Sequence, residues 1–309
     1  MARFIKNILK FVLVLPLFYL AYLLLVACST IFTLKIEALT FTNTKTAGSN
    51  YQRTIDLDKW IAKTSKNKGL ILGSSTAYKN INPYVLSERT GVDFFNNGSS
   101  SQCIFESAYL LDYVLENTEI EYLLLETFPG AWDMVGYETA TDWVVNNYKP
   151  QRAYVFNTVK HANSLNLWLF YSYFYVKRSI PYTKDYLHYS PDEDNYKGLG
   201  FAYTRDSEFE RVNSTYKSYD TISPLNKRSL ERIINICREK NIKLILVMAK
   251  IFNADINKTI LTQYDVPLID CNNFQIDSTY YYDSHHMYGR GTDSFSRWLG
   301  DEFNQLMLK

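Results

Sequence analysis

The most apolar part of the chain is its N-terminal stretch. No charged residue occurs in 11–34, and the basic residues Arg3, Lys6 and Lys10 precede it. This run is longer than the roughly 20 residues that a helix needs to cross a bilayer. Because a basic flank favours the cytoplasmic side, we expect a membrane anchor over 1–34 and an extracytoplasmic location, periplasmic or on the cell surface, for the rest.

A second interpretation of this stretch involves a cysteine. Leu25-Val26-Ala27-Cys28 resembles the lipobox of bacterial lipoproteins, in which the cysteine carries a lipid. A signal peptide has an apolar core of only about 7 to 15 residues, whereas this run continues beyond Cys28. We therefore favour an uncleaved signal anchor, and lipidation of Cys28 stays open as the alternative.

Beyond a polar segment over 35–66, which we interpret as a stalk, short apolar runs alternate with helical patterns over 67–309. Short apolar runs bounded by turn residues predict buried parallel strands, and apolar residues spaced three or four apart predict helices. This alternation is typical of an α/β fold with a doubly wound parallel sheet of five strands, similar to flavodoxin. We expect strands at 69–73, 92–96, 120–125, 242–247 and 266–269, and helices at 58–63, 82–90, 102–116, 224–240 and 291–307.

The alternation breaks over 128–223. This stretch contains Trp132, Trp143, Trp168 and many tyrosines, and it lacks clean strand signals. We expect a helical insertion after the third strand. Loops at the carboxyl ends of strands surround the ligand crevice of such folds, so the insertion would form a lid, a partner surface or a purely structural cover.

Composition narrows the possible partners. Lys plus Arg is 33 and Asp plus Glu is 32, which gives a net charge of +1 and no field that would attract nucleic acid. The 26 Tyr and 18 Phe suit a sugar-binding or protein-binding face, although codon usage in an AT-rich genome explains them equally well. Cys103, Cys237 and Cys271 form no CxxC pair, so we predict neither a zinc site nor a functional disulfide.

Two small-residue turns follow the first two expected strands. Gly73-Ser74-Ser75 places hydroxyl groups at a sharp turn, as a nucleophilic serine requires, and a helix cap is the plainer interpretation. A phosphate bound at Gly73 to Thr76 is a further alternative, but no nucleotide fingerprint accompanies it. After the second strand, Gly98 lets the backbone approach closely, so its N–H and that of Ser75 are candidate oxyanion donors.

The strongest motif lies near the C-terminus, at Asp283-Ser284-His285-His286. An aspartate three residues before a histidine can fix its tautomer, and the histidine can then act as general base. We assign these roles to Asp283 and His286. The His285–His286 pair could also suggest a metal, but no second cluster has ligand spacing, so we predict no metal and no cofactor.

These motifs together resemble the SGNH (GDSL-type) hydrolase superfamily, over about 68–127 and 224–305. The resemblance implies that Ser75 is the nucleophile, that Gly98 is the second-block glycine, and that Asp283 and His286 complete the site beside His285. Ser74 replaces the usual aspartate, and the third-block Gly-x-Asn-Asp is missing, which leaves Thr127 or a residue of the insertion as the substitute donor. In both departures the sequence resembles an envelope branch of this superfamily, which includes alginate O-acetylation and D-alanyl transfer proteins.

The resemblance implies acyl transfer or ester hydrolysis through a Ser75 acyl-enzyme. The expected substrates are an envelope glycan or an acylated small molecule, and a membrane-bound O-acyltransferase is a possible partner. The alternative is a non-catalytic binding or assembly protein of an envelope polysaccharide system. The missing Asn donor and the aromatic insertion favour this alternative, whereas the joint presence of Ser75, Asp283 and His286 opposes it.

Overall fold

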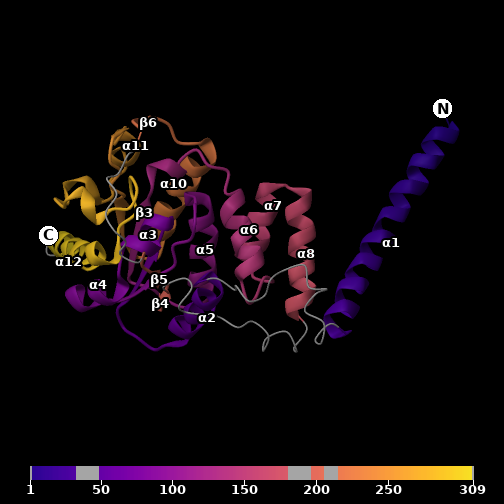
Figure 1. Cartoon of the computed structure of the whole chain (residues 1–309), viewed down its shortest axis with the longest axis horizontal. Helices are drawn as coiled ribbons and strands as arrows, with labels where there is room; N and C mark the ends of the chain where they lie inside the picture. The colour runs from indigo at the N-terminus through magenta and orange to yellow at the C-terminus, as the bar shows by residue number, and fades with distance from the viewer. Residues whose placement is uncertain (1, 33–48, 180–195, 205–214, 308–309) are drawn as a thin grey trace.

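The centre of the molecule is a parallel sheet of five strands in the order β2-β1-β3-β7-β9. The computed structural model describes residues 2–32, 49–179, 196–204 and 215–307 (Figure 1). All five expected strands are present, each shifted by no more than a few residues, and the predicted α/β class is confirmed. The strands are β1 Lys68–Leu72, β2 Asp93–Asn96, β3 Tyr122–Thr127, β7 Lys243–Met248 and β9 Leu268–Asp270.

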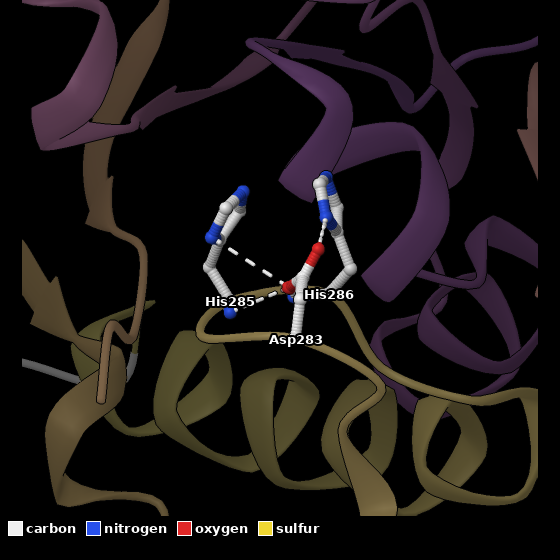
Figure 2. A group of neighbouring side chains, drawn as sticks. All are labelled: Asp283, His285 and His286. Atoms are coloured by element: carbon white, nitrogen blue, oxygen red, sulfur yellow. Dashed lines mark hydrogen bonds and ion pairs between the residues drawn. The ribbon is translucent and has the colours of Figure 1, made fainter. Parts of the chain in front are cut away.

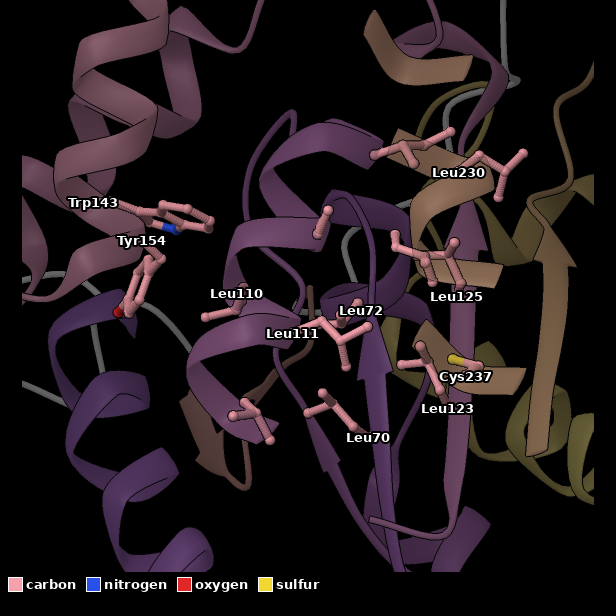
Figure 3. Packing of buried hydrophobic residues seen from close by; sticks show 14 of the residues in the cluster. Leu70, Leu72, Leu110, Leu111, Leu123, Leu125, Trp143, Tyr154, Leu230 and Cys237 are labelled. Carbon is pink, nitrogen blue, oxygen red and sulfur yellow. The ribbon is translucent and has the colours of Figure 1, made fainter. Parts of the chain in front are cut away.

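Helices cover both faces of the sheet because alternate strand residues point to opposite sides. Leu70 and Leu72 face α5 and α10, and Figure 3 shows them with Leu123 and Leu125 opposite Leu230. The other face packs against α3, α4 and α12 through a separate cluster of buried residues. The helices are α2 Ser49–Ala62, α3 Ser75–Asn80, α4 Pro83–Thr90, α5 Ile104–Asn117, α10 Pro224–Glu239, α11 Thr259–Thr262 and α12 Gly289–Met307.

Helix α2 lies wholly inside the segment 35–66 that we interpreted as a stalk. It begins at Ser49, earlier than the short helix expected at 58–63, and its Leu57 and Trp60 lie in the core. Arg53 of this helix is 2% exposed and donates to the carbonyl oxygens of Gly98 and Gly200. The remaining part of the expected stalk, 35–48, lies outside the described residues.

The expected insertion is helical over most of its described part. Helices α6 Tyr137–Asn146, α7 Ala153–Ala162 and α8 Leu165–Ser179 form a layer beside α5, which Figure 1 shows between the sheet and α1. The chain also contains the short 3-10 helices η4 Pro129–Ala131, η6 Cys271–Asn273 and η7 Ser278–Tyr280.

The insertion also contains short strands, which the sequence analysis did not predict. Its described part contains β4 Tyr196–Gly198, β5 Phe201–Ala202 and β6 Lys217–Tyr219. Strands β4 and β5 form an antiparallel hairpin, and β6 pairs with β8 Ala254–Ile256. Strands of two or three residues are too short for an alternating pattern to be recognised, which explains why the sequence did not reveal them.

Helix α1 extends over Ala2–Phe32 and stands on the far side of α8 from the sheet (Figure 1). Its segment Lys10–Cys28 is long and apolar enough to cross a membrane, and it is only 6% buried. The Tyr22 hydroxyl donates to the Leu169 carbonyl of α8 at 3.2 Å. By length and composition α1 could therefore be a membrane anchor or a signal sequence.

Candidate active site

Ser75 is the first residue of α3, directly beyond the carboxyl end of β1. Gly73 makes the exit from the strand with φ +154°, a conformation that favours glycine. Ser74 caps the helix by accepting the Thr76 N–H on its hydroxyl. The Ser75 side chain is half-buried, and its N–H belongs to the first helical turn, whose amides have no acceptor within the helix.

Asp283 organises the loop that carries the two histidines. Its Oδ1 accepts the N–H groups of His285 at 2.8 Å and His286 at 2.7 Å, and its Oδ2 lies 2.6 Å from His286 Nδ1. Figure 2 shows the carboxylate between the two imidazole rings. The same carboxylate thus closes the turn and orients the His286 ring, which explains the three-residue spacing of the motif.

The structure brings this loop to Ser75. His286 Nε2 lies 2.7 Å from Ser75 Oγ, so Ser75, His286 and Asp283 form a continuous hydrogen-bonded relay. The Tyr282 ring stacks on His286 with a centroid distance of 5.3 Å and an interplanar angle of 6°. Lys79 donates to the Tyr282 hydroxyl at 2.8 Å. Because Lys79 belongs to α3, this bond ties the Tyr282 ring to the helix that begins at Ser75.

Asn80, which the sequence analysis missed, joins the last turn of α3 to the histidine loop. Its Nδ2 donates to the His285 carbonyl at 2.8 Å, and its Oδ1 accepts the Met287 N–H at 2.9 Å. Both bonds are made by the backbone of the loop, so the side chain fixes the distance between helix and loop. An asparagine at a helix end is a common sequence feature and gave no signal of this role.

The charges at the site favour an ionised Asp283 and a neutral His285. Burial alone would raise the pKa of Asp283, but the hydrogen bond and charge of His286 outweigh it and hold this pKa well below its usual range. Burial, together with the charge of His286, lowers the pKa of His285 to about 4. The His285 ring packs on Phe128 at 4.6 Å, and its Nδ1 pairs with Ser284 Oγ at 2.8 Å.

Gly98 lies against the nucleophile turn as the sequence led us to expect. A Cβ at this position would come within 2.9 Å of Ala77 Cβ and of the Ser74 carbonyl oxygen. The Gly98 N–H, however, donates to Asn96 Oδ1 at 3.2 Å. The expected oxyanion donor therefore already has a partner in this structure, and it would have to leave Asn96 to bind a ligand.

Ser74 and Thr127 are placed differently from Ser75. The Ser74 hydroxyl is buried and bonds Thr76 Oγ1 at 2.8 Å and Glu126 Oε2 at 3.1 Å. The Thr127 hydroxyl is buried and donates to the Val247 carbonyl at 3.3 Å. Both hydroxyls are satisfied inside the protein, so they support the turn and the sheet rather than facing a ligand.

Glu126 is a further residue that the sequence analysis did not assign. Its carboxyl group is buried directly under the nucleophile turn and accepts from Ser74 and Thr76. Burial raises its pKa to about 7, although the hydrogen bonds from Thr76 and Ser74 oppose this. A charged residue directly after the buried run Leu123 to Leu125 was the signal that could have identified it.

The hairpin β4–β5 docks at the same edge of the sheet. The Leu199 carbonyl accepts the Asn96 N–H at 2.9 Å. Gly200 has φ +81°, and a Cβ there would lie 1.5 Å from the Asn96 carbonyl oxygen, so this contact requires glycine. The segment Lys197 to Phe201 thus places its backbone beside the loop that carries Gly98.

Asp283, His285 and His286 also offer ligand atoms within 4.8 Å of one another, which is compatible with a metal ion. Both ring nitrogens of His286 already bond to Asp283 and Ser75. A metal on His286 would displace one of these bonds and break the relay. The arrangement therefore suits proton transfer better than metal binding.

Neither a protein-family model nor a curated protein matches this sequence. Among solved structures, the fold is similar to a chain from Desulfitobacterium hafniense DCB-2 described as a lipolytic protein of the G-D-S-L family, with a TM-score of 0.38 and 8% identity. The match covers 77% of this chain and 99% of that chain. At this TM-score the likeness carries no weight for the chemistry, which depends on the distances given above.

Proposed function

We propose that this protein is a serine acyl-ester enzyme that forms an acyl-enzyme on Ser75. The observation that carries the proposal is the relay from Ser75 Oγ to His286 Nε2 and from His286 Nδ1 to Asp283. A serine hydroxyl is a weak nucleophile until a base removes its proton, and an oriented histidine beside it supplies that base.

In the first half-reaction, Ser75 Oγ would attack the carbonyl carbon of an ester while His286 takes its proton. The oxyanion would accept hydrogen bonds from the Ser75 N–H and, after Gly98 leaves Asn96, from the Gly98 N–H. Collapse breaks the bond to the leaving alcohol, which receives the proton from His286. The ionised Asp283 stabilises the imidazolium throughout.

In the second half-reaction, His286 would deprotonate a hydroxyl that attacks the Ser75 ester. If that hydroxyl belongs to water the outcome is hydrolysis, and if it belongs to a sugar the outcome is O-acyl transfer. We favour transfer of an acetyl group to a cell-envelope glycan. The supporting features are the apolar helix α1, which is suited to anchoring at a membrane, and a Gly98 donor that is already hydrogen-bonded.

The envelope location, the glycan acceptor and supply by a membrane-bound O-acyltransferase all belong to this proposal. They rest on the resemblance of the sequence motifs to the envelope branch of the SGNH superfamily. An α1 helix that spans the membrane with its basic flank inside would place the relay on the extracytoplasmic side.

A fluorophosphonate probe tests the central claim, since it reacts covalently with an activated serine. We expect the full-length protein in detergent to be labelled, and Ser75→Ala to abolish labelling while thermal unfolding stays unchanged. Ser218→Ala is the matched control, because Ser218 is exposed and bonds only locally to Asp220. Absence of labelling in the folded wild type would refute the proposal.

A second candidate function is non-catalytic glycan binding, and the engaged Gly98 N–H is the observation that favours it. This candidate predicts that the folded wild type resists the probe. It also predicts that Ser75→Ala retains full affinity for envelope polysaccharide, measured by calorimetry.

A further inference from the structure

A buried carboxyl group lies under the nucleophile turn outside the Ser75–His286–Asp283 relay. Glu126 is 4% exposed and belongs to the carboxyl end of β3. Its Oε2 accepts the Ser74 N–H at 2.7 Å and the Ser74 hydroxyl at 3.1 Å, and its Oε1 accepts the Thr76 hydroxyl at 2.7 Å. Because a buried carboxyl is costly without partners, this set of donors indicates that the turn is built around it.

Glu126 holds the turn on both sides of the nucleophile. Ser74 precedes Ser75 and is held by its backbone and its side chain, whereas Thr76 follows Ser75 and is held by its side chain. A Cβ at Gly73 would lie 2.3 Å from Glu126 Oε2, so only glycine lets the strand pass this close. Neither neighbour of Ser75 can move without breaking a bond to the same carboxyl.

We infer that Glu126 is a positioning residue for Ser75. By fixing Ser74 and Thr76 it would place the Ser75 hydroxyl beside His286 Nε2. It would also orient the Ser75 N–H, which lies in the first turn of α3. The inference rests on the proposed function of Ser75. Since a misplacement of about 1 Å can lower a rate about 10²-fold, loss of this support should be visible in the kinetics of the serine.

A merely stabilising carboxyl would behave differently, and the chain offers a matched example. Glu106 in α5 is fully buried, and its Oε2 accepts the Cys103 N–H at 2.9 Å. It caps its own helix, and no described hydrogen bond joins it to Ser74 or Thr76. Glu106→Ala therefore reports the cost of losing a buried carboxyl without touching the nucleophile turn.

The first experiment measures fluorophosphonate labelling of the full-length protein in detergent as a function of probe concentration. We expect Glu126→Ala to lower the limiting labelling rate about 10²-fold while the half-saturating probe concentration stays the same. Glu126→Gln should retain a rate within about fivefold of wild type, because its amide can still bond Ser74 and Thr76. Glu106→Ala should label at the wild-type rate per folded molecule.

Two kinetic outcomes would overturn the inference. One is wild-type labelling by folded Glu126→Ala, which would show that the turn holds without the carboxyl. The other is an equal loss in Glu126→Gln and Glu126→Ala, which would show that charge rather than hydrogen bonding matters.

The second experiment is independent of any activity and separates this inference from the proposed function. Amide hydrogen exchange reports the turn directly, because the Ser74 N–H bonds Glu126 and the Ala77 N–H bonds the Ser74 carbonyl. We expect Glu126→Ala to accelerate exchange at Ser74 and Ala77 at least tenfold, and Glu106→Ala to leave both unchanged. If the wild type resists the probe, the proposed function fails while this exchange result still decides the role of Glu126. Unchanged exchange in Glu126→Ala refutes the inference even if Ser75 labels.

Discussion

The groups on the two sides of Ser75 differ in whether their hydrogen bonds are directed at Ser75. On the proton-transfer side, His286 and Asp283 are aligned at 2.7 Å and 2.6 Å, and Tyr282 and Asn80 fix their loop against α3. On the oxyanion side, the Gly98 N–H bonds Asn96. The hydroxyl of Thr127, which the sequence suggested as a substitute oxyanion donor, bonds the Val247 carbonyl.

This difference shows that proton transfer and oxyanion binding depend on different kinds of interaction. Proton transfer depends on side chains from one short loop, which a local motif can specify completely. Oxyanion binding depends on backbone amides, whose availability is decided by neighbours such as Asn96 and by the turn geometry over Glu126. For the proposed acyl-enzyme reaction, a complete relay beside a partly engaged oxyanion side predicts slow turnover.

The largest expected effect comes from disrupting the hydrogen bond between Asp283 and His286. Asp283→Asn keeps an oxygen for the backbone amides of the loop but can donate to His286 Nδ1, which favours the wrong tautomer. We expect fluorophosphonate labelling of Ser75 to fall about 10³- to 10⁴-fold. Asp277→Asn is the control, because Asp277 is exposed and accepts the Thr279 N–H in a similar local turn. Labelling within tenfold of wild type would show that Asp283 does not orient the base.

The sequence was most informative where function and local structure coincide. The Asp283 to His286 spacing predicts a turn and a relay at once, because one carboxylate serves both. Strands β1, β3 and β7 were recognisable because each contains a run of buried, mostly apolar residues. By contrast, the Thr127 hydroxyl donates to the carbonyl of Val247 on another strand, and no local pattern specifies such a contact.

The next effect concerns Glu126 and the pH dependence of stability. Burial raises its pKa from 4.5 to about 7, so folding favours the protonated acid. Its contribution to stability is therefore complete below about pH 4.5 and is lost as the pH rises to about 7, a change on the order of 3 kcal/mol. Glu126→Gln stays neutral, so we expect its unfolding free energy relative to wild type to rise by about this amount from pH 4.5 to pH 8.

Urea unfolding at both pH values measures this difference. Glu106→Gln is not a suitable control here, because burial also raises the pKa of Glu106 well above its usual range. The exposed substitution Glu116→Gln serves instead, because no described hydrogen bond or ion pair engages the Glu116 side chain, and it should follow the wild-type pH dependence. An identical pH dependence in Glu126→Gln and wild type would mean that the pKa of Glu126 is the same in the folded and the unfolded protein.

An intermediate effect tests the oxyanion side. Gly98→Ala places a methyl group 2.9 Å from Ala77 Cβ and the Ser74 carbonyl, so the loop must shift away from the nucleophile turn. We expect labelling of Ser75 to slow about 30-fold, or about 2 kcal/mol, since one oxyanion donor is displaced. Gly91→Ala is informative for comparison, because the space around Gly91 is open and only its φ of +73° opposes the substitution. If Gly98→Ala labels like wild type, the loop plays no part in binding the oxyanion.

A smaller effect distinguishes the adjacent histidines. The pKa of His285 is lowered to about 4, so this ring is neutral at pH 7 and contributes no charge to the relay. It packs on Phe128 and bonds Ser284, whereas His286 bonds Ser75. We expect His285→Ala to change labelling by no more than about fivefold, the value of one hydrogen bond, and His286→Ala to abolish it. An equal loss of labelling in His285→Ala and His286→Ala would show that both histidines, and not His286 alone, are needed to activate Ser75.

The smallest effect is expected at Thr127, and it sharpens the contrast between the two sides. If the hydroxyl served the oxyanion, its removal would slow labelling about 10²-fold, as loss of a donor does elsewhere. The hydroxyl instead donates to the Val247 carbonyl inside the sheet, 3.3 Å away. Thr127→Val preserves the shape and removes this bond, so we expect a stability loss of about 1 kcal/mol in urea unfolding and labelling within about twofold of wild type. A 10²-fold slower reaction would show that Thr127 turns toward the substrate during the reaction, and that the oxyanion side is more complete than its resting contacts indicate.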